Sequence, residues 1–122
     1  PKYQNIIQEQ ILFFSEKINI LTEFGIHDII IDPGFGFGKT IAHNYELLSK
    51  LDAFNVLGRP ILAGISRKGM LYKPLNGTAE TALPATVAAN VLALERGASI
   101  LRVHDAEAAK QAVSVWELTL DQ

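Results

Sequence analysis

The sequence predicts a parallel α/β fold that forms part of a (β/α)8 barrel. Three short apolar runs show no alternation of polar and apolar residues, which is typical of strands buried on both faces, and helical patterns separate them. The predicted strand ends at Asp32, Ser66 and His104 are 34 and 38 residues apart. Eight such units make roughly 270 residues, the scale of a closed barrel. We therefore expect the 122 residues to form the second part of a barrel cut from a longer chain.

The first elements are a helix and a strand. Apolar residues at three- and four-residue intervals predict the helix, and Gly25 follows as its stop. The β-branched run over 28–32 predicts the first strand, and a glycine-rich loop from Pro33 to Gly38 follows it. The next helical set is Leu47, Leu48, Leu51 and Phe54.

Two further strand–helix units complete the chain. We expect strands over 60–65 and 99–103, with an Ala-rich helix over 82–96 between them. Pro84 fits the first turn of that helix, which needs no N–H donor. Asp105 is expected to cap a last helix. Strands that alternate with helices favour parallel pairing through right-handed crossovers, so residues 1–122 form a single partial barrel domain.

Composition narrows the function classes. With 11 Lys+Arg against 13 Asp+Glu, the net charge is −2, so no basic surplus favours nucleic acid as a partner. No apolar run approaches the ~20 residues of a membrane helix. The chain has no Cys, which excludes disulfides, thiolate metal sites and thiol nucleophiles, and its three His show no metal-ligand spacing.

Polar residues gather where the predicted strands end. Because the loops after parallel strands meet at one face of a barrel, these residues are expected to share a site. A carboxylate at one strand end and cations at the other two indicate a polar or anionic substrate. The residues are Asp32, then Ser66 with Arg67 and Lys68, then Arg102 with His104.

The glycine-rich loop fits neither common phosphate motif. A Walker A loop would need Gly where Pro33 stands, and glycines at 34, 36 and 38 do not match G-x-G-x-x-G. Alternating Gly and Phe permit a tight backbone that presents rings to a flat ligand. The alternative is a turn whose two phenylalanines plug the barrel mouth.

Three motifs in this order and spacing resemble dihydropteroate synthase. They are Asp-Pro-Gly-Phe-Gly-Phe-Gly-Lys (32–39), Gly-Ile-Ser-Arg-Lys (64–68) and Arg-Val-His-Asp (102–105). The resemblance covers essentially the whole chain and implies strands 6–8 of the barrel with the preceding helix. It implies condensation of 4-aminobenzoate with 6-hydroxymethyl-7,8-dihydropterin diphosphate, in folate biosynthesis, with release of diphosphate.

The resemblance also implies roles for single residues. Asp32 and Lys68 are the expected catalytic residues and bind the pterin together with Gly64. A buried carboxylate that faces two N–H donors makes a strong, directional pair with the pterin edge. Arg102 and His104 are expected at the leaving diphosphate. The implied 4-aminobenzoate contacts are Phe37 on the ring, Ser66 at the carboxylate, Lys68, and Arg67 at the rim.

The family further implies a cytoplasmic homodimer that uses Mg²⁺. The protein ligand of that ion would lie near the first barrel strand, so no metal ligand is expected in these residues. The implied reaction loses diphosphate to leave a stabilised cation, which the amine attacks without a covalent protein nucleophile. Because five strands and their loops would lie elsewhere, we expect the 122 residues alone to be inactive.

Two alternatives remain at this point. One is a related pterin-binding barrel that transfers a methyl group, although the cations at two strand ends favour a reaction that releases diphosphate. The other is a non-catalytic half-barrel remnant, which intact motifs do not exclude.

Overall fold

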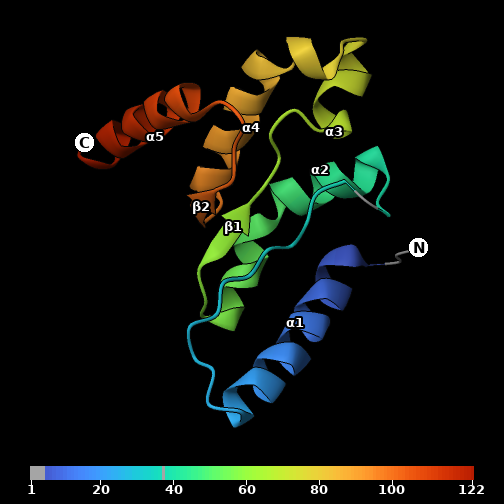
Figure 1. Cartoon of the computed structure of the whole chain (residues 1–122), viewed down its shortest axis with the longest axis vertical. Coiled ribbons are helices and arrows are strands. Elements are labelled where there is room, and N and C mark those ends of the chain that lie inside the picture. Colours follow the sequence, from blue (N-terminus) through green and yellow to red (C-terminus); the bar gives the residue numbers. More distant parts are fainter. Residues whose placement is uncertain (1–4, 37) are drawn as a thin grey trace.

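The computed structural model describes residues 5–36 and 38–122 and shows an α/β arrangement (Figure 1). Five α-helices, three short 3-10 helices and two strands are found in this part of the chain. Their order is α1 (Ile6–Glu23), α2 (Ile41–Ser49), η1 (Leu51–Leu57), β1 (Ile61–Ala63), α3 (Gly69–Tyr72), η2 (Lys73–Leu75), η3 (Ala79–Thr81), α4 (Leu83–Glu95), β2 (Ala98–Leu101) and α5 (Ala106–Leu120).

The two strands pair in parallel, as the alternation of strands and helices predicts. Leu62 lies opposite Ile100 and Ala63 opposite Leu101, and the backbone N–H of Arg102 extends the pairing by donating to the carbonyl of Ala63 at 3.0 Å. The chain returns from β1 to β2 through α3, the two short 3-10 helices and α4 (Figure 1). This pairing brings the residues that follow each strand to the same end of the sheet.

The predicted strand over 28–32 is wrong as a regular strand. Ile31 forms one parallel bridge with Ile61: its N–H donates to the carbonyl of Pro60 at 2.9 Å, and its carbonyl accepts from Leu62 at 2.8 Å. A strand needs a continuous ladder, and within the described residues this segment has ladder bonds at Ile31 only. The segment nevertheless runs beside β1, so Asp32 reaches the same end of the sheet (Figure 1).

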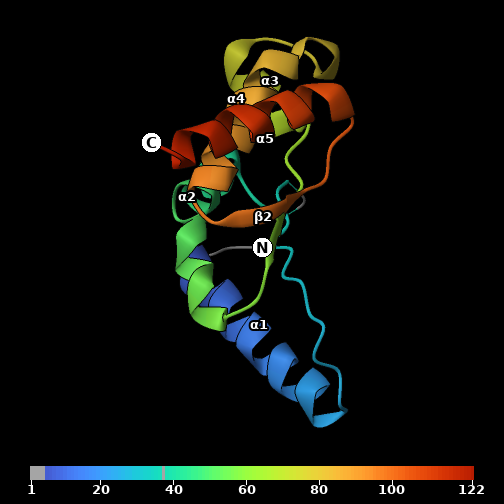
Figure 2. The ribbon, with the colours of Figure 1, turned by 90° about the vertical axis from the view of Figure 1, so that its left-hand side faces the viewer.

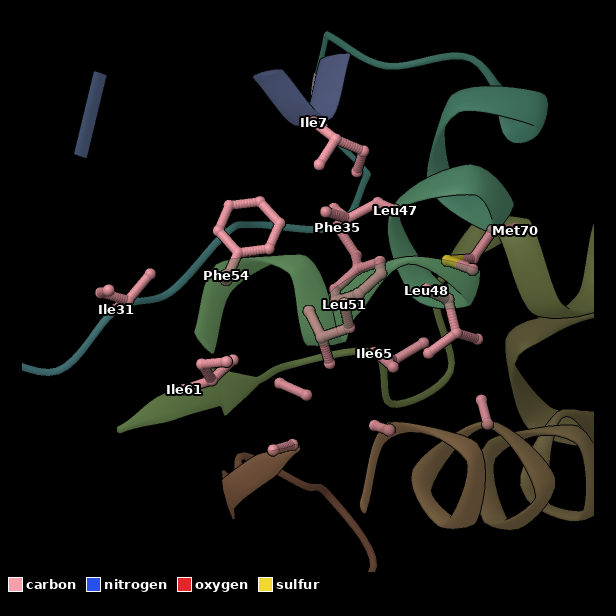
Figure 3. Packing of buried hydrophobic residues seen from close by; sticks show 14 of the residues in the cluster. Ile7, Ile31, Phe35, Leu47, Leu48, Leu51, Phe54, Ile61, Ile65 and Met70 are labelled. Atoms are coloured by element: carbon pink, nitrogen blue, oxygen red, sulfur yellow. The ribbon is translucent and has the colours of Figure 1, made fainter. Parts of the chain in front are cut away.

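The hydrophobic core lies between one face of the strands and the helices that cover it. Figure 3 shows Ile31, Ile61 and Ile65 directed toward Leu51 and Phe54 of η1. Alternate residues of the extended segments, such as Ile61 and Ala63, are fully buried on this face. The strands therefore have one well-packed side that fixes their position.

The other face of the sheet is not buried, contrary to the expectation of strands covered on both sides. Ile30 is 54% exposed, and Leu62 and Ile100 are only half-buried. Helices cover a single face because α1, α2, η1 and α4 all pack on the side of Ile61. Figure 2 shows β2 at the edge of the sheet, below α5.

Helix boundaries follow local capping. The side chain of Asn5 accepts the Gln8 N–H at 3.1 Å and starts α1, and Gly25 follows its end with a φ of 81°, as predicted for a helix stop. Pro84 occupies the first turn of α4, as expected. Within the described residues, no helix combines the length and apolar character needed to cross a membrane.

Candidate functional site

The glycine-rich loop is held in place by hydrogen bonds to its own backbone. Glycine is required here because φ is positive at Gly34 and Gly36 (72° and 108°). The buried amide of Asn44 accepts the Gly36 N–H at 2.8 Å, and the Lys39 ammonium donates to the carbonyl of Gly34 at 2.7 Å. Phe37, the predicted ring contact, lies outside the described residues.

Lys39 is hydrogen-bonded to this loop and is not only a solvated side chain. Burial lowers its pKa, and the nearby carboxylate of Asp32 opposes that effect. The sequence holds one indication of this contact. A loop of alternating glycines exposes several carbonyl groups that lack partners, and a lysine directly after it can donate to them.

Arg67 joins three segments of the chain. It has a left-handed backbone (φ 55°), and its N–H donates to the buried hydroxyl of Thr86 at 3.0 Å. Its guanidinium group forms a two-pronged ion pair with Asp105, with N···O distances of 2.8 and 3.0 Å. The same group donates to the carbonyls of Ala79 and Glu80 at 2.7 and 3.1 Å. Arg67 thus ties the loop after β1 to η3 and to the start of α5.

Asp105 does not cap α5 with its side chain as predicted, although it occupies the N-cap position. Its carboxylate faces Arg67 instead, and a charge-assisted, two-pronged pair is stronger than a cap bond to a backbone N–H. The hydrogen bonds and charge of Arg67 hold the pKa of Asp105 below its ordinary value. Sequence spacing alone could not reveal this partner, which is 38 residues away.

Asp32 and Arg102 meet across the end of the sheet, as their positions after the extended segments predict. One guanidinium nitrogen of Arg102 lies 2.7 Å from an Asp32 carboxylate oxygen, while the other oxygen accepts the Gly34 N–H at 3.1 Å. Gly64 makes room for the arginine: a Cβ atom there would lie 2.7 Å from its Cζ. A side chain at position 64 would therefore displace the arginine from this position.

A small cavity of about 110 Å³ lies beside this pair. The backbone N–H of His104 lies 3.3 Å and its Nδ1 3.0 Å from the buried hydroxyl of Ser66. The walls of this small cavity are formed by Gly64, Ser66, Lys68, Arg102, Val103 and His104. Five of the eight predicted site residues therefore line one cavity. Asp32 does not line it but is paired with Arg102, which does.

Lys68 stands between this cavity and a larger one of about 450 Å³. Its ammonium donates to the carbonyl of Phe35 at 2.6 Å. Burial lowers the pKa of Lys68, the cations of Arg102 and Lys39 lower it further, and Asp32 opposes them. The larger cavity also includes Lys73, the first residue of η2, which the sequence analysis did not select because no recognisable motif surrounds it.

The assembled groups suit an anionic or electron-rich ligand. Lys68, Arg102 and His104 supply donors around the small cavity, and Asp32 supplies an acceptor for N–H groups. Among residues 5–36 and 38–122, no three His, Cys, Asp or Glu side chains are grouped to hold a metal ion. The chain's own residues at this site therefore offer charge and hydrogen bonds.

Residues 1–104 match the family described as pterin binding enzyme. The chain belongs to this pterin-binding family. It is 39% identical over 121 residues to the dihydropteroate synthase of Haemophilus influenzae, an alignment that covers 98% of this chain and 44% of that protein. It is 40% identical over 122 residues to the dihydropteroate synthase of Escherichia coli, covering 98% and 43%. The chain thus spans a little under half the length of these relatives.

Solved structures agree with the sequence relatives. The crystal structure of Yersinia pestis dihydropteroate synthase superimposes with a TM-score of 0.96 at 36% identity, over all of this chain and 51% of that one. The enzyme of Xanthomonas albilineans in complex with 7,8-dihydropteroate gives 0.94 at 40% identity, over 98% and 48%. The α/β architecture is therefore that of about half of a dihydropteroate synthase.

Proposed function

We propose that the protein containing these residues is a dihydropteroate synthase, which condenses 4-aminobenzoate with 6-hydroxymethyl-7,8-dihydropterin diphosphate. The observation that carries the proposal is the grouping of Asp32, Lys68, Arg102 and His104 at one end of the paired strands. Support comes from family membership and from a similar structure that contains 7,8-dihydropteroate.

The reaction is a substitution at the pterin's exocyclic methylene carbon. The C–O bond to diphosphate breaks with its electron pair on oxygen, and the amine nitrogen of 4-aminobenzoate forms the new C–N bond and then loses a proton. Arg102 and His104 stabilise the charge that develops on the departing diphosphate. This role is supported by the single hydrogen bond that Arg102 makes to Asp32, which leaves its other N–H donors available to a ligand.

Asp32 and Lys68 orient the pterin. The Asp32 carboxylate accepts N–H donors of the aminopyrimidine edge, which replace its contact with Arg102. Lys68 lies near the reacting carbon with its ammonium fixed on the carbonyl of Phe35, and Gly64 keeps the floor of the pterin site open. The two residues position the substrate rather than bond to it covalently.

The second substrate occupies the opposite side of Lys68. Phe37 would pack against the ring of 4-aminobenzoate, while Arg67 defines the rim. The hydroxyl of Ser66, expected at the carboxylate, lies in the small cavity beside His104, so we place Ser66 near the amine end of the ring. Four of the five guanidinium N–H donors of Arg67 are taken by Asp105 and two carbonyl groups, so its main contribution is to hold the loop that carries Ser66 and Lys68.

Mg²⁺, dimerisation and cytoplasmic location belong to the same proposal. As the resemblance to dihydropteroate synthase implies, we place the protein ligand of an ion that assists diphosphate near the first barrel strand, outside residues 1–122. A homodimer would form through the late helices α4 and α5.

The barrel position is part of the proposal as well. The extended segment at 28–32, β1 and β2 would be strands 6, 7 and 8 of the barrel. The exposed side chain of Ile30 and the half-buried side chains of Leu62 and Ile100 would then face its interior. An apolar groove of about 840 Å³ between α5 and β2 would receive the neighbouring barrel element.

Activity is tested by following dihydropteroate formation with the full-length protein, its two substrates and Mg²⁺. We expect turnover, loss of turnover in Lys68→Met, and no turnover by residues 1–122 alone. Diphosphate release is measured in parallel, because methyl transfer would occur without it. A folded full-length protein that forms no dihydropteroate would contradict the proposal and favour a non-catalytic barrel.

A further inference from the structure

The 450 Å³ cavity has a distinct chemical character. Its walls combine the apolar side chains of Phe35, Ile41 and Met70 with three lysines, Lys39, Lys68 and Lys73. None of the described residues that line it is acidic. A concave, partly apolar surface with several cations and no carboxylate fits a small aromatic anion.

The three ammonium groups are not equally engaged. Lys39 donates to the carbonyl of Gly34 at 2.7 Å and Lys68 to that of Phe35 at 2.6 Å. The ammonium group of Lys73 makes no hydrogen bond or ion pair within the described residues, and the residue is exposed. It is thus the cation of this cavity that can take a ligand without giving up a protein contact.

Gly69 directs Lys73 to this place. The lysine side chain folds back over the glycine, so that a Cβ atom at position 69 would lie 3.2 Å from its Cε and 3.4 Å from its Nζ. The Lys73 N–H also bonds to the Gly69 carbonyl, which fixes the turn between α3 and η2. A side chain at position 69 would compete with the lysine for the same space.

Lys68 lines both cavities, so each substrate can occupy one of them with the reacting atoms near Lys68. Arg102 and His104 line only the small cavity, on the side of the leaving group. The attacking amine must reach the reacting carbon near Lys68, so the opposite end of its ring points into the larger cavity. We propose that Lys73 is a further substrate-binding residue, whose ammonium group pairs with the carboxylate of the aromatic amine.

This inference rests on the proposed function for the identity of the ligand, and its test separates the two. Binding of 4-aminobenzoate to the full-length protein is titrated with hydroxymethylpterin and inorganic diphosphate present, so that the small cavity is filled and no leaving group can be lost. The same titration uses 4-aminobenzamide, which keeps the ring and the amine but has no charge.

Lys73→Met is expected to weaken 4-aminobenzoate binding about fivefold, the size of a partly exposed ion pair, and to leave 4-aminobenzamide binding unchanged. Gly69→Ala is expected to act in the same direction by displacing the lysine. Lys17→Met on α1, an exposed lysine that is not among the residues lining the cavity, is the matched control and should have no effect.

Catalysis gives an independent readout. In the synthase reaction, Lys73→Met should raise KM for 4-aminobenzoate about fivefold, with kcat and KM for the pterin diphosphate unchanged. Equal affinity of Lys73→Met and wild type for 4-aminobenzoate, or an equal loss for the uncharged amide, would overturn the inference. Absence of turnover with a charge-dependent loss of binding would instead contradict the proposed function alone.

Discussion

The two arginine–aspartate pairs at this end of the sheet are built differently. Arg67 and Asp105 are paired through two nitrogens and two oxygens, have 23% and 29% side-chain exposure, and Arg67 also donates to two carbonyl groups. Arg102 contacts Asp32 through a single nitrogen, with exposures of 56% and 37%. Arg67 makes four hydrogen bonds with its five N–H donors, whereas Arg102 makes one and keeps donors free beside a cavity.

This difference separates support from binding. An exposed pair with one contact contributes roughly 0–1 kcal/mol to folding, so a ligand can replace it at little cost. Breaking the Arg67 pair would instead release three segments of the chain at once. Similar residues at neighbouring strand ends therefore need not share a role. Substituting each arginine in turn tests whether Arg67 and Arg102 have these separate roles.

The largest expected effect is on catalysis. Arg102→Met in the full-length protein should lower kcat/KM for the pterin diphosphate about 100-fold, because a donor to the developing charge is lost. The melting temperature should change little. Steady-state kinetics and a thermal melt on the same preparation measure both, and a large fall in the melting temperature would contradict the division of roles.

Arg67→Met should show the opposite pattern. The melting temperature should fall clearly, and more than in Arg102→Met, because η3, the loop after β1 and the start of α5 lose their common partner. Arg67→Lys should not restore it, since an ammonium group cannot form the two-pronged pair. Thermal melts of the three proteins provide the comparison, and a wild-type melting temperature in Arg67→Met would be inconsistent with a supporting role.

Gly64→Ala should affect binding to a smaller extent. The new Cβ would lie 2.7 Å from Cζ of Arg102 and 3.0 Å from its Nε, so the arginine must move away from Asp32. We expect KM for the pterin diphosphate to rise about tenfold, roughly 1.4 kcal/mol. Gly58→Ala, where the added atom meets nothing within 4 Å, tests whether added bulk by itself matters.

The smallest effect concerns pH. Arg67 lowers the folded-state pKa of Asp105, so the pair stabilises the fold above the unfolded carboxyl pKa and loses this contribution as pH falls through the folded value. The free energy of unfolding of wild type should exceed that of Asp105→Asn near pH 7, and this difference should shrink as the pH falls below about 4. Denaturant unfolding across this range measures it, and a gap that widens in acid would have the wrong sign.

Much of the site follows from the sequence because chain order and parallel pairing fix where strand ends meet. Asp32, Ser66, Arg102 and His104 come together for this reason even though Ile31 forms a single bridge instead of a strand. The expectation that both faces of the sheet are buried was wrong. An apolar run shows that a strand can be covered on both faces, but it does not show which helices or strands lie against each face.

Side-chain partners were the part that spacing could not supply. Asp105 has the position and chemistry of an N-cap, yet it binds Arg67 from another loop. In the sequence, Lys39 and Lys73 have no feature that separates them from solvated lysines. In the structure, the turns around Gly34 and Gly69 direct them to the larger cavity. Such choices depend on three-dimensional proximity between segments that no local pattern connects.

The most direct test of the account is the affinity of the full-length protein for inorganic diphosphate, measured by calorimetry well below the melting temperature of each variant. We predict that Arg102→Met weakens binding at least about tenfold, or roughly 1.4 kcal/mol, while folded Arg67→Met binds within about twofold of wild type. Wild-type affinity in Arg102→Met, or a greater loss in Arg67→Met, would contradict the assignment of Arg102 to the ligand and Arg67 to the fold.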